Sequence, residues 1–423
     1  MELRKWYKLD NAGKVFPSVS TISRSNVFRL SVEMKQNIDP LILQKATELT
    51  IKRFPTLNVS LRRGLFWYYL EANDNYPRIS EEGPYMLKYF ESYRGEYGFL
   101  FRVLYYEKRI SVEMFHALTD GTGALEFIKS LVYSYLMLKD VDLPKNVDIL
   151  TENIEVIKEE EQDSFTENFS KKLKSPRNEI KALKYKTPLY KDNWLGFIVG
   201  YIPLNQLKKV AKTYNATVNE YISALLINSA YRCKNIFEDK NRPFALLVPV
   251  NLRKFFPSKS LRNFSLFVNT AVDLNKELSF LEIIAKVKQD MDSELQKEKL
   301  QAHLANNVRA EKNFFLRIAP RFIKEIALKI AYLALGDRVH SVSLSNLGII
   351  NIPKAMQEHI ESFTFTPGGG FSSPLNLGVV TYQNTVAIAF STALRSRVFQ
   401  KEFFTQLTSE GIEVVIDNND LEV

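Results

Sequence analysis

One stretch of the sequence changes its hydrophobic period within a few residues. Between residues 109 and 114, apolar and polar side chains alternate, which is typical of a half-buried strand. A short segment with two glycines follows. Apolar residues then recur at helical spacing, at Ala124, Leu125, Ile128, Leu131, Val132, Tyr135 and Leu136. The sequence therefore predicts a strand, a loop and a helix in direct succession.

The predicted loop carries an imidazole and a carboxylate four residues apart. His116 stands at the end of the strand, and Asp120 and Gly121 precede the helix. A strand end holds a side chain rigidly and histidine titrates near neutral pH, so His116 suits the role of a general base. Asp120 could equally be the N-cap of the following helix. The stretch alone leaves both interpretations open.

Strands and helices alternate in both halves of the chain. This pattern predicts an α/β (α+β) protein built from two similar subdomains, residues 1–150 and 195–423. Between them, residues 151–194 are acidic at first and basic later, with poor periodicity. We interpret this segment as a surface-exposed crossover linker.

Composition excludes several classes of protein. With 45% hydrophobic residues, the chain can bury a large core, which excludes disorder. The net charge of +9 favours anionic partners, but the basic residues are scattered and no nucleic-acid motif is present, so we expect no nucleic-acid partner. The single cysteine, Cys233, excludes an internal disulfide, and four histidines make a metal site hard to assemble.

Membrane association rests on a single segment. No apolar run reaches membrane-spanning length and the N-terminus lacks a signal-peptide core, so we expect a cytoplasmic protein without an integral membrane segment. Residues 314–335 place Ile318, Phe322, Ile326 and Ile330 on one face among basic residues. This pattern fits a basic amphipathic helix on a membrane surface, a lid, or a packed helix, and the packed interpretation is favoured.

Several motifs resemble, in the same order, those of the chloramphenicol acetyltransferase superfamily, which includes alcohol O-acetyltransferases, wax-ester synthases and condensation domains. The loop sequence FHALTDG resembles the HxxxDG active-site motif of that superfamily. The other matching stretches are Ile51–Leu57, Ala216–Ala224, Pro249–Arg253, Asn263–Thr270 and Ser343–Gly348. Together they cover residues from about 40 to 395 of this chain.

The resemblance implies a pseudo-dimer of two subdomains with an active-site tunnel between them that crosses at His116. It implies that His116 is the general base and that Asp120, followed by Gly121, is structural and pairs with an arginine of the second subdomain. Arg253 is our candidate for that arginine. Ser345 or Asn346 would lie near the tunnel and donate to the oxyanion.

The expected activity is acyl transfer, with acetyl-CoA or another acyl-CoA as cosubstrate, a small-molecule hydroxyl acceptor and no metal. Condensation domains and wax-ester synthases usually carry two consecutive histidines, but Phe115 occupies the first position here, which favours simple O-acetyltransferases. The alternative is a non-catalytic protein, or a condensation-like protein that depends on a carrier protein.

Overall fold

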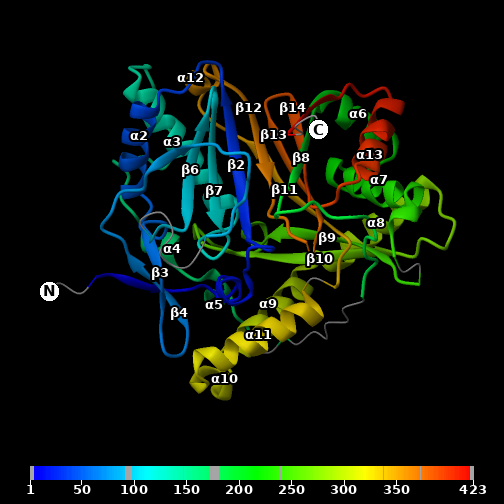
Figure 1. Cartoon of the computed structure of the whole chain (residues 1–423), viewed down its shortest axis with the longest axis horizontal. Coiled ribbons are helices and arrows are strands. Elements are labelled where there is room, and N and C mark those ends of the chain that lie inside the picture. The colour runs from blue at the N-terminus through cyan, green and yellow to red at the C-terminus, as the bar shows by residue number, and fades with distance from the viewer. Residues whose placement is uncertain are drawn as a thin grey trace.

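A computed structural model describes residues 4–90, 98–145, 147–171, 173, 181–238, 241–336, 338–371 and 373–419. It contains two large sheets with helices on their outer faces (Figure 1). This arrangement confirms the predicted α/β class. Among the described residues, no helix is long and apolar enough to cross a membrane.

The first sheet has five strands and carries the predicted loop. Their order is β12 (Ile360–Thr366), β2 (Val27–Met34), β7 (Arg109–Phe115), β6 (Phe101–Tyr106) and β5 (Ile79–Glu81). Only the β5–β6 pair is parallel within these described strands. Helices α2 (Pro40–Lys52) and α3 (Gly121–Leu138) cover its outer face (Figure 1). The carboxylate of Asp39 caps α2 by accepting from two backbone amides.

The second sheet has seven strands. Their order is β10 (Ser265–Val272), β9 (Phe244–Asn251), β11 (Val342–Ile350), β13 (Leu375–Tyr382), β14 (Thr385–Thr392), β8 (Gly196–Pro203) and β15 (Val415–Asn418). Its apolar outer face is covered by α6 (Leu204–Thr213), α7 (Val218–Arg232), α8 (Phe280–Glu294) and α13 (Val398–Ser409). Thr217 and Glu220 form a capping box at the start of α7, as their spacing in the sequence permits.

Smaller elements complete the molecule. A three-stranded sheet contains β1 (Trp6–Lys8), β4 (Tyr68–Ala72) and β3 (Val59–Arg63). The remaining α-helices are α1 (Phe16–Val19), α4 (Lys158–Glu161), α5 (Ser164–Glu167), α9 (Lys297–Lys312), α10 (Phe314–Ile318), α11 (Arg321–Leu335) and α12 (Lys354–Gln357). In Figure 1, α9, α10 and α11 extend below the two sheets.

The two sheets are joined through β12, a strand from the second half of the chain. It pairs with β2 of the first sheet and lies against β13 and β14 of the second. A Cβ atom on Gly378 of β13 would lie 2.0 Å from the backbone oxygen of Phe365, so only glycine allows this approach. The first sheet therefore takes a strand from within residues 195–423.

The segment between the halves differs in part from the prediction. Residues 172 and 174–180 of the predicted linker lie outside the described residues. Within the described part, Glu160 of α4 is buried and forms two hydrogen bonds with the buried guanidinium of Arg53, at 2.7 and 2.8 Å. The prediction of an exposed linker is therefore wrong at this point, because a buried guanidinium requires a charged partner.

Candidate active site

His116 follows β7 directly and lies between two aromatic rings. Its backbone N–H donates to the carbonyl of Asn26 at 2.9 Å, which ties the residue to the start of β2. The imidazole stacks on Phe16, with ring centroids 4.6 Å apart, and meets Phe28 edge-on at 5.2 Å. The side chain is half-buried. These contacts fix the plane of the ring, while part of the side chain stays accessible to solvent.

Asn263 determines which nitrogen of His116 carries the proton. Its amide Nδ2 donates to the backbone oxygen of His116 at 3.0 Å and to Asp10 Oδ2 at 3.1 Å. Both partners accept, so the amide oxygen Oδ1 must face the ring nitrogen Nδ1, which lies 3.0 Å away. An amide oxygen only accepts, so Nδ1 carries the proton and Nε2 keeps its lone pair.

The surroundings keep the ring neutral. Burial lowers the pKa of His116 below its ordinary value of 6.5, while the charge of Asp120 and the hydrogen bond to Asn263 oppose this shift in part. A neutral ring with the proton on Nδ1 presents a basic Nε2. Among the described residues this nitrogen has no hydrogen-bond partner.

Both carboxylate oxygens of Asp120 accept hydrogen bonds. Oδ1 accepts from the backbone amides of Thr122 and Gly123 and so caps α3. Oδ2 accepts from Arg253 Nη1 at 2.7 Å and from the backbone N–H of Phe264 at 2.8 Å. The carboxylate therefore holds the start of α3 against the second half of the chain, through the pair that the resemblance implies.

The start of α3 also approaches the second half closely. A Cβ atom on Gly123 would lie 2.1 Å from both the backbone oxygen of Leu261 and Thr119 Oγ1. A Cβ atom on Gly121 would lie 2.4 Å from a methyl group of Leu347 on β11. The glycines of this segment thus leave room for the second half of the chain.

The structure separates the two candidate oxyanion donors. Ser345 of β11 pairs with Gly378 of β13, and a Cβ atom on Gly378 would point at Phe365 of β12, so Ser345 lies on the face of the second sheet that is turned toward the first sheet. Asn346 lies on the opposite face, on the side of α7, and is itself exposed; its Nδ2 donates to Asn219 of α7 at 3.3 Å. Of the predicted residues, His116, Asp120, Gly121 and Arg253 form one cluster, and Ser345 lies on the β11 face toward it.

Several residues around His116, among them Asn263, Asp10 and Phe16, were not predicted as site residues. Asn263 belongs to a stretch that the resemblance covers, but Asp10 and Phe16 lie in an N-terminal segment without a recognisable pattern. Their roles depend on contacts between segments far apart in sequence, for which the sequence contains no local signal. A second histidine, His340, binds Ser373 through Nε2 at 2.9 Å, and burial lowers its pKa to about 4.

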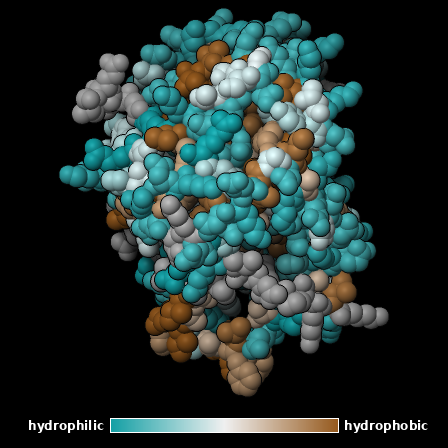
Figure 2. All heavy atoms as spheres, turned by 90° about the vertical axis from the view of Figure 1, so that its right-hand side faces the viewer, coloured by the Kyte–Doolittle hydropathy of each residue, from teal (hydrophilic) through white to brown (hydrophobic). Residues whose placement is uncertain are grey.

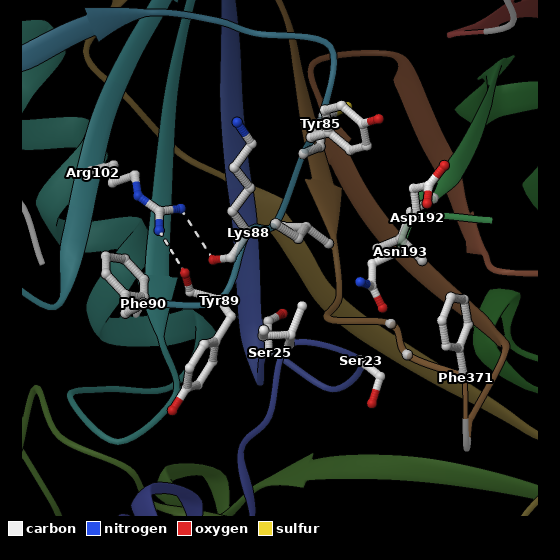
Figure 3. A pocket seen from close by; sticks show the side chains of 16 residues that line it. Ser23, Ser25, Tyr85, Lys88, Tyr89, Phe90, Arg102, Asp192, Asn193 and Phe371 are labelled. Atoms are coloured by element: carbon white, nitrogen blue, oxygen red, sulfur yellow. Dashed lines mark hydrogen bonds between the residues drawn. The ribbon is translucent and has the colours of Figure 1, made fainter. Parts of the chain in front are cut away.

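A pocket of about 390 Å³ lies beside this cluster (Figure 3). Its walls come from both halves of the chain, since residues 85–90 face residues 192, 193, 195 and 369–371. Ser25 of the lining is next to Asn26, which binds His116, and Phe90 contacts Phe115. Arg102 stiffens the wall by donating to the backbone oxygens of Lys88 and Tyr89 (Figure 3). The pocket therefore approaches His116 only through neighbouring residues, since Asn26 and Phe115 stand between its lining and the imidazole.

Among the described residues, no three side chains of His, Cys, Asp or Glu come together as a group that could hold a metal ion.

No family model and no curated protein matches the sequence. Solved structures match over nearly the whole chain. TRI101 of F. sporotrichioides, complexed with coenzyme A and T-2, is 11% identical over 98% of this chain and 100% of that one, with a TM-score of 0.64. The trichothecene 15-O-acetyltransferase TRI3 from Fusarium sporotrichioides is 11% identical over 96% and 94%, with a TM-score of 0.59.

The starter condensation domain of rhizomide synthetase RzmA is 13% identical over 96% of each chain, with a TM-score of 0.53. At these identities the likeness concerns the fold, and it agrees with the resemblance seen in the sequence motifs. The chain therefore has the two-subdomain fold that chloramphenicol acetyltransferase-like acyltransferases share with condensation domains.

Proposed function

We propose that this protein is an acyltransferase that moves an acyl group from a CoA thioester to a hydroxyl acceptor, with His116 as general base. The observation that carries the proposal is the neutral imidazole that Asn263 holds with Nε2 unpartnered among the described residues, where both halves of the chain meet. The matching folds of a CoA complex and of an acetyltransferase support it.

The first step is removal of a proton from the acceptor. A hydroxyl is a weak nucleophile at neutral pH, and transfer of its proton to Nε2 as the oxygen attacks the thioester carbonyl lowers the barrier. His116 then carries a proton on both nitrogens. Nδ1 keeps its proton and continues to donate to Asn263 Oδ1, and the carboxylate of Asp120 favours the positive charge.

The attack produces a tetrahedral intermediate with an anionic oxygen. A fixed donor near this oxygen is required, and we assign that role to Ser345 rather than to Asn346, whose amide binds Asn219. When the intermediate collapses, the C–S bond breaks and His116 returns its proton to the leaving thiolate. The ester and free CoA are the products, and no covalent enzyme intermediate is needed.

Asp120 and Arg253 have a structural role in this proposal. Their ion pair holds the His116 loop and the start of α3 in place, while Gly121 and Gly123 leave room for the second half of the chain. We assign the pocket beside Phe90 and Ser25 to one of the two substrates, because its lining adjoins Asn26, which accepts from the backbone of His116, and Phe115, which precedes His116.

A carrier-protein thioester is the second candidate donor, since a condensation domain shares the fold. The test is release of free thiol from acetyl-CoA across a panel of alcohols. Wild type should release thiol and form ester, and His116→Ala should lose roughly 10²–10⁴-fold in rate. Transfer that survives in His116→Ala would disprove the assigned base. Activity with acyl-phosphopantetheine but not with acetyl-CoA would favour the carrier protein.

A further inference from the structure

Ten large apolar side chains stand exposed on one part of the surface. They belong to α10, to α11 and to the turn between β3 and β4, and we call this surface the apolar platform. Its members are Leu65, Phe66, Phe314, Phe315, Leu316, Ile318, Phe322, Ile323, Ile326 and Ile330, each 44–77% exposed. Figure 2 shows hydrophobic side chains gathered at the lower end of the molecule, at the height of α10 and α11 in Figure 1.

This finding overturns the packed interpretation of residues 314–335. The segment is not one helix, because α10 ends at Ile318 and α11 begins at Arg321 after Pro320. A proline fits the start of a helix but interrupts a continuous one. The bend directs two short apolar faces outward rather than into the core.

The platform is held in one arrangement by polar contacts beneath it. Arg321 donates its backbone N–H to the carbonyl of Leu65 at 2.9 Å. Lys324 is 4% exposed, and its ammonium donates to the carbonyls of Phe66 at 3.0 Å and Arg317 at 3.1 Å. The same ammonium lies 4.2 Å from the ring centroid of Trp67. One buried cation thus connects the β3–β4 turn to both helices.

We propose that the apolar platform binds the surface of an anionic lipid bilayer. An ordered, protruding set of aromatic and aliphatic side chains suits insertion at the boundary of headgroups and acyl chains. Monomeric soluble proteins rarely expose so many contiguous apolar residues. The platform extends away from the rest of the molecule, as Figure 1 shows for α10, which suits a flat lipid surface.

The charge around the platform favours anionic lipids. Residues 312–336 contain five basic residues, Lys312, Arg317, Arg321, Lys324 and Lys329, and a single acidic residue, Glu325. Glu325 is paired with Arg321 and accepts from Tyr68, so it adds no free negative charge. Lys312, Arg317 and Lys329 are exposed, as is Arg63 near the β3–β4 turn. Exposed cations beside inserted apolar side chains attract lipid headgroups of opposite charge.

Helix α11, which carries part of the platform, is linked to the candidate active site through α1. Helix α11 lies against α1, and Arg24, just beyond α1, lies 4.5 Å from the ring of Tyr332 on α11. Phe16 of α1 stacks on His116. If the proposed function holds, binding of the bilayer would bring the enzyme close to hydroxyl acceptors dissolved in the membrane. The binding of lipid itself does not depend on that activity.

Vesicle flotation tests the proposal. The full chain is mixed with vesicles of phosphatidylcholine alone, or of phosphatidylcholine with phosphatidylglycerol, and floated through a density gradient. Wild type should float with the anionic vesicles and much less with the neutral ones. Phe315→Ser with Phe322→Ser should reduce the vesicle-bound fraction roughly tenfold or more, because two exposed aromatic anchors are lost. Arg317→Glu with Lys329→Glu should abolish the preference for anionic vesicles.

Leu41→Ser is the matched control, because Leu41 is 78% exposed on α2 and outside the platform. It should float like wild type. Thermal melts of all variants should agree, since each altered side chain is exposed. Wild type that stays unbound with anionic vesicles, or a Phe315→Ser/Phe322→Ser variant that floats equally well, would overturn the proposal. A dimer in sedimentation equilibrium that this variant abolishes, without flotation of wild type, would assign the platform to self-association instead. A water-soluble alcohol in the acyltransferase assay tests the proposed function separately.

Discussion

Asn263 holds His116 at two places. Its amide oxygen lies 3.0 Å from the ring nitrogen Nδ1, and its amide nitrogen donates to the backbone oxygen of the same histidine at 3.0 Å. The residues are 147 positions apart, and they come from the two halves of the chain. The contact that selects the basic tautomer of His116 therefore forms only when the two halves of the chain pack together.

The Asn263→Ala variant should separate positioning from folding. Loss of the amide frees the ring to rotate and to exchange tautomers, so kcat should fall roughly 10²-fold, with a much smaller change in KM. Steady-state kinetics measure both constants, and a thermal melt reports any loss of stability at Asp10. Asn205→Ala, an exposed change on α6, should match wild type. A kcat within twofold of wild type would show that Asn263 does not position the base.

The pH profile of kcat/KM should report the titration of His116. The base acts only when neutral, and burial lowers its pKa from 6.5. The rate should therefore be constant at neutral pH and fall as pH decreases through a midpoint below 6.5. A midpoint above 6.5 would mean that another group controls the reaction or that the ring is better solvated than its contacts imply.

Removal of the Asp120 carboxylate should lower the free energy of unfolding more than removal of an ordinary helix cap does. Asp120→Ala leaves the guanidinium of Arg253 and the backbone N–H of Phe264 without their buried partner, so the free energy of unfolding should fall by about 3–5 kcal/mol. The Asp120→Asn variant retains a helix cap, so its free energy of unfolding should fall by less. Urea titrations measure both. Asp39→Ala removes a cap with no ion pair among the described residues and should cost about 1 kcal/mol. Equal losses for Asp120→Ala and Asp39→Ala would contradict a special role of the ion pair.

Gly123→Ala should be destabilising although alanine favours helices. The added methyl group would lie 2.1 Å from the backbone oxygen of Leu261, so the two halves must move apart at this point. We expect a loss of about 1–3 kcal/mol in unfolding free energy and lower activity. Gly83→Ala is the control, because nothing lies within 4 Å of its Cβ position. A Gly123→Ala variant as stable as this control would show that the contact relaxes freely.

The sequence alone was sufficient for the local elements and for much of the predicted cluster. The change of period after His116, the cap at Asp39 and the box at Thr217 are encoded by neighbouring residues, because helix caps and burial periods act over a few positions. The resemblance of the loop and of Pro249–Arg253 pointed to Asp120 and Arg253, which the structure places 2.7 Å apart.

Tertiary structure alone decided the rest. The transfer of β12 into the first sheet and the contacts of Asn263 and Phe16 with His116 depend on packing between distant segments. The amphipathic pattern of residues 314–335 is compatible with either burial or exposure. Exposure followed from the bend at Pro320 and from the polar contacts of Lys324, which direct the apolar faces outward. Periodicity shows that a face is apolar, but only the fold determines what lies against it.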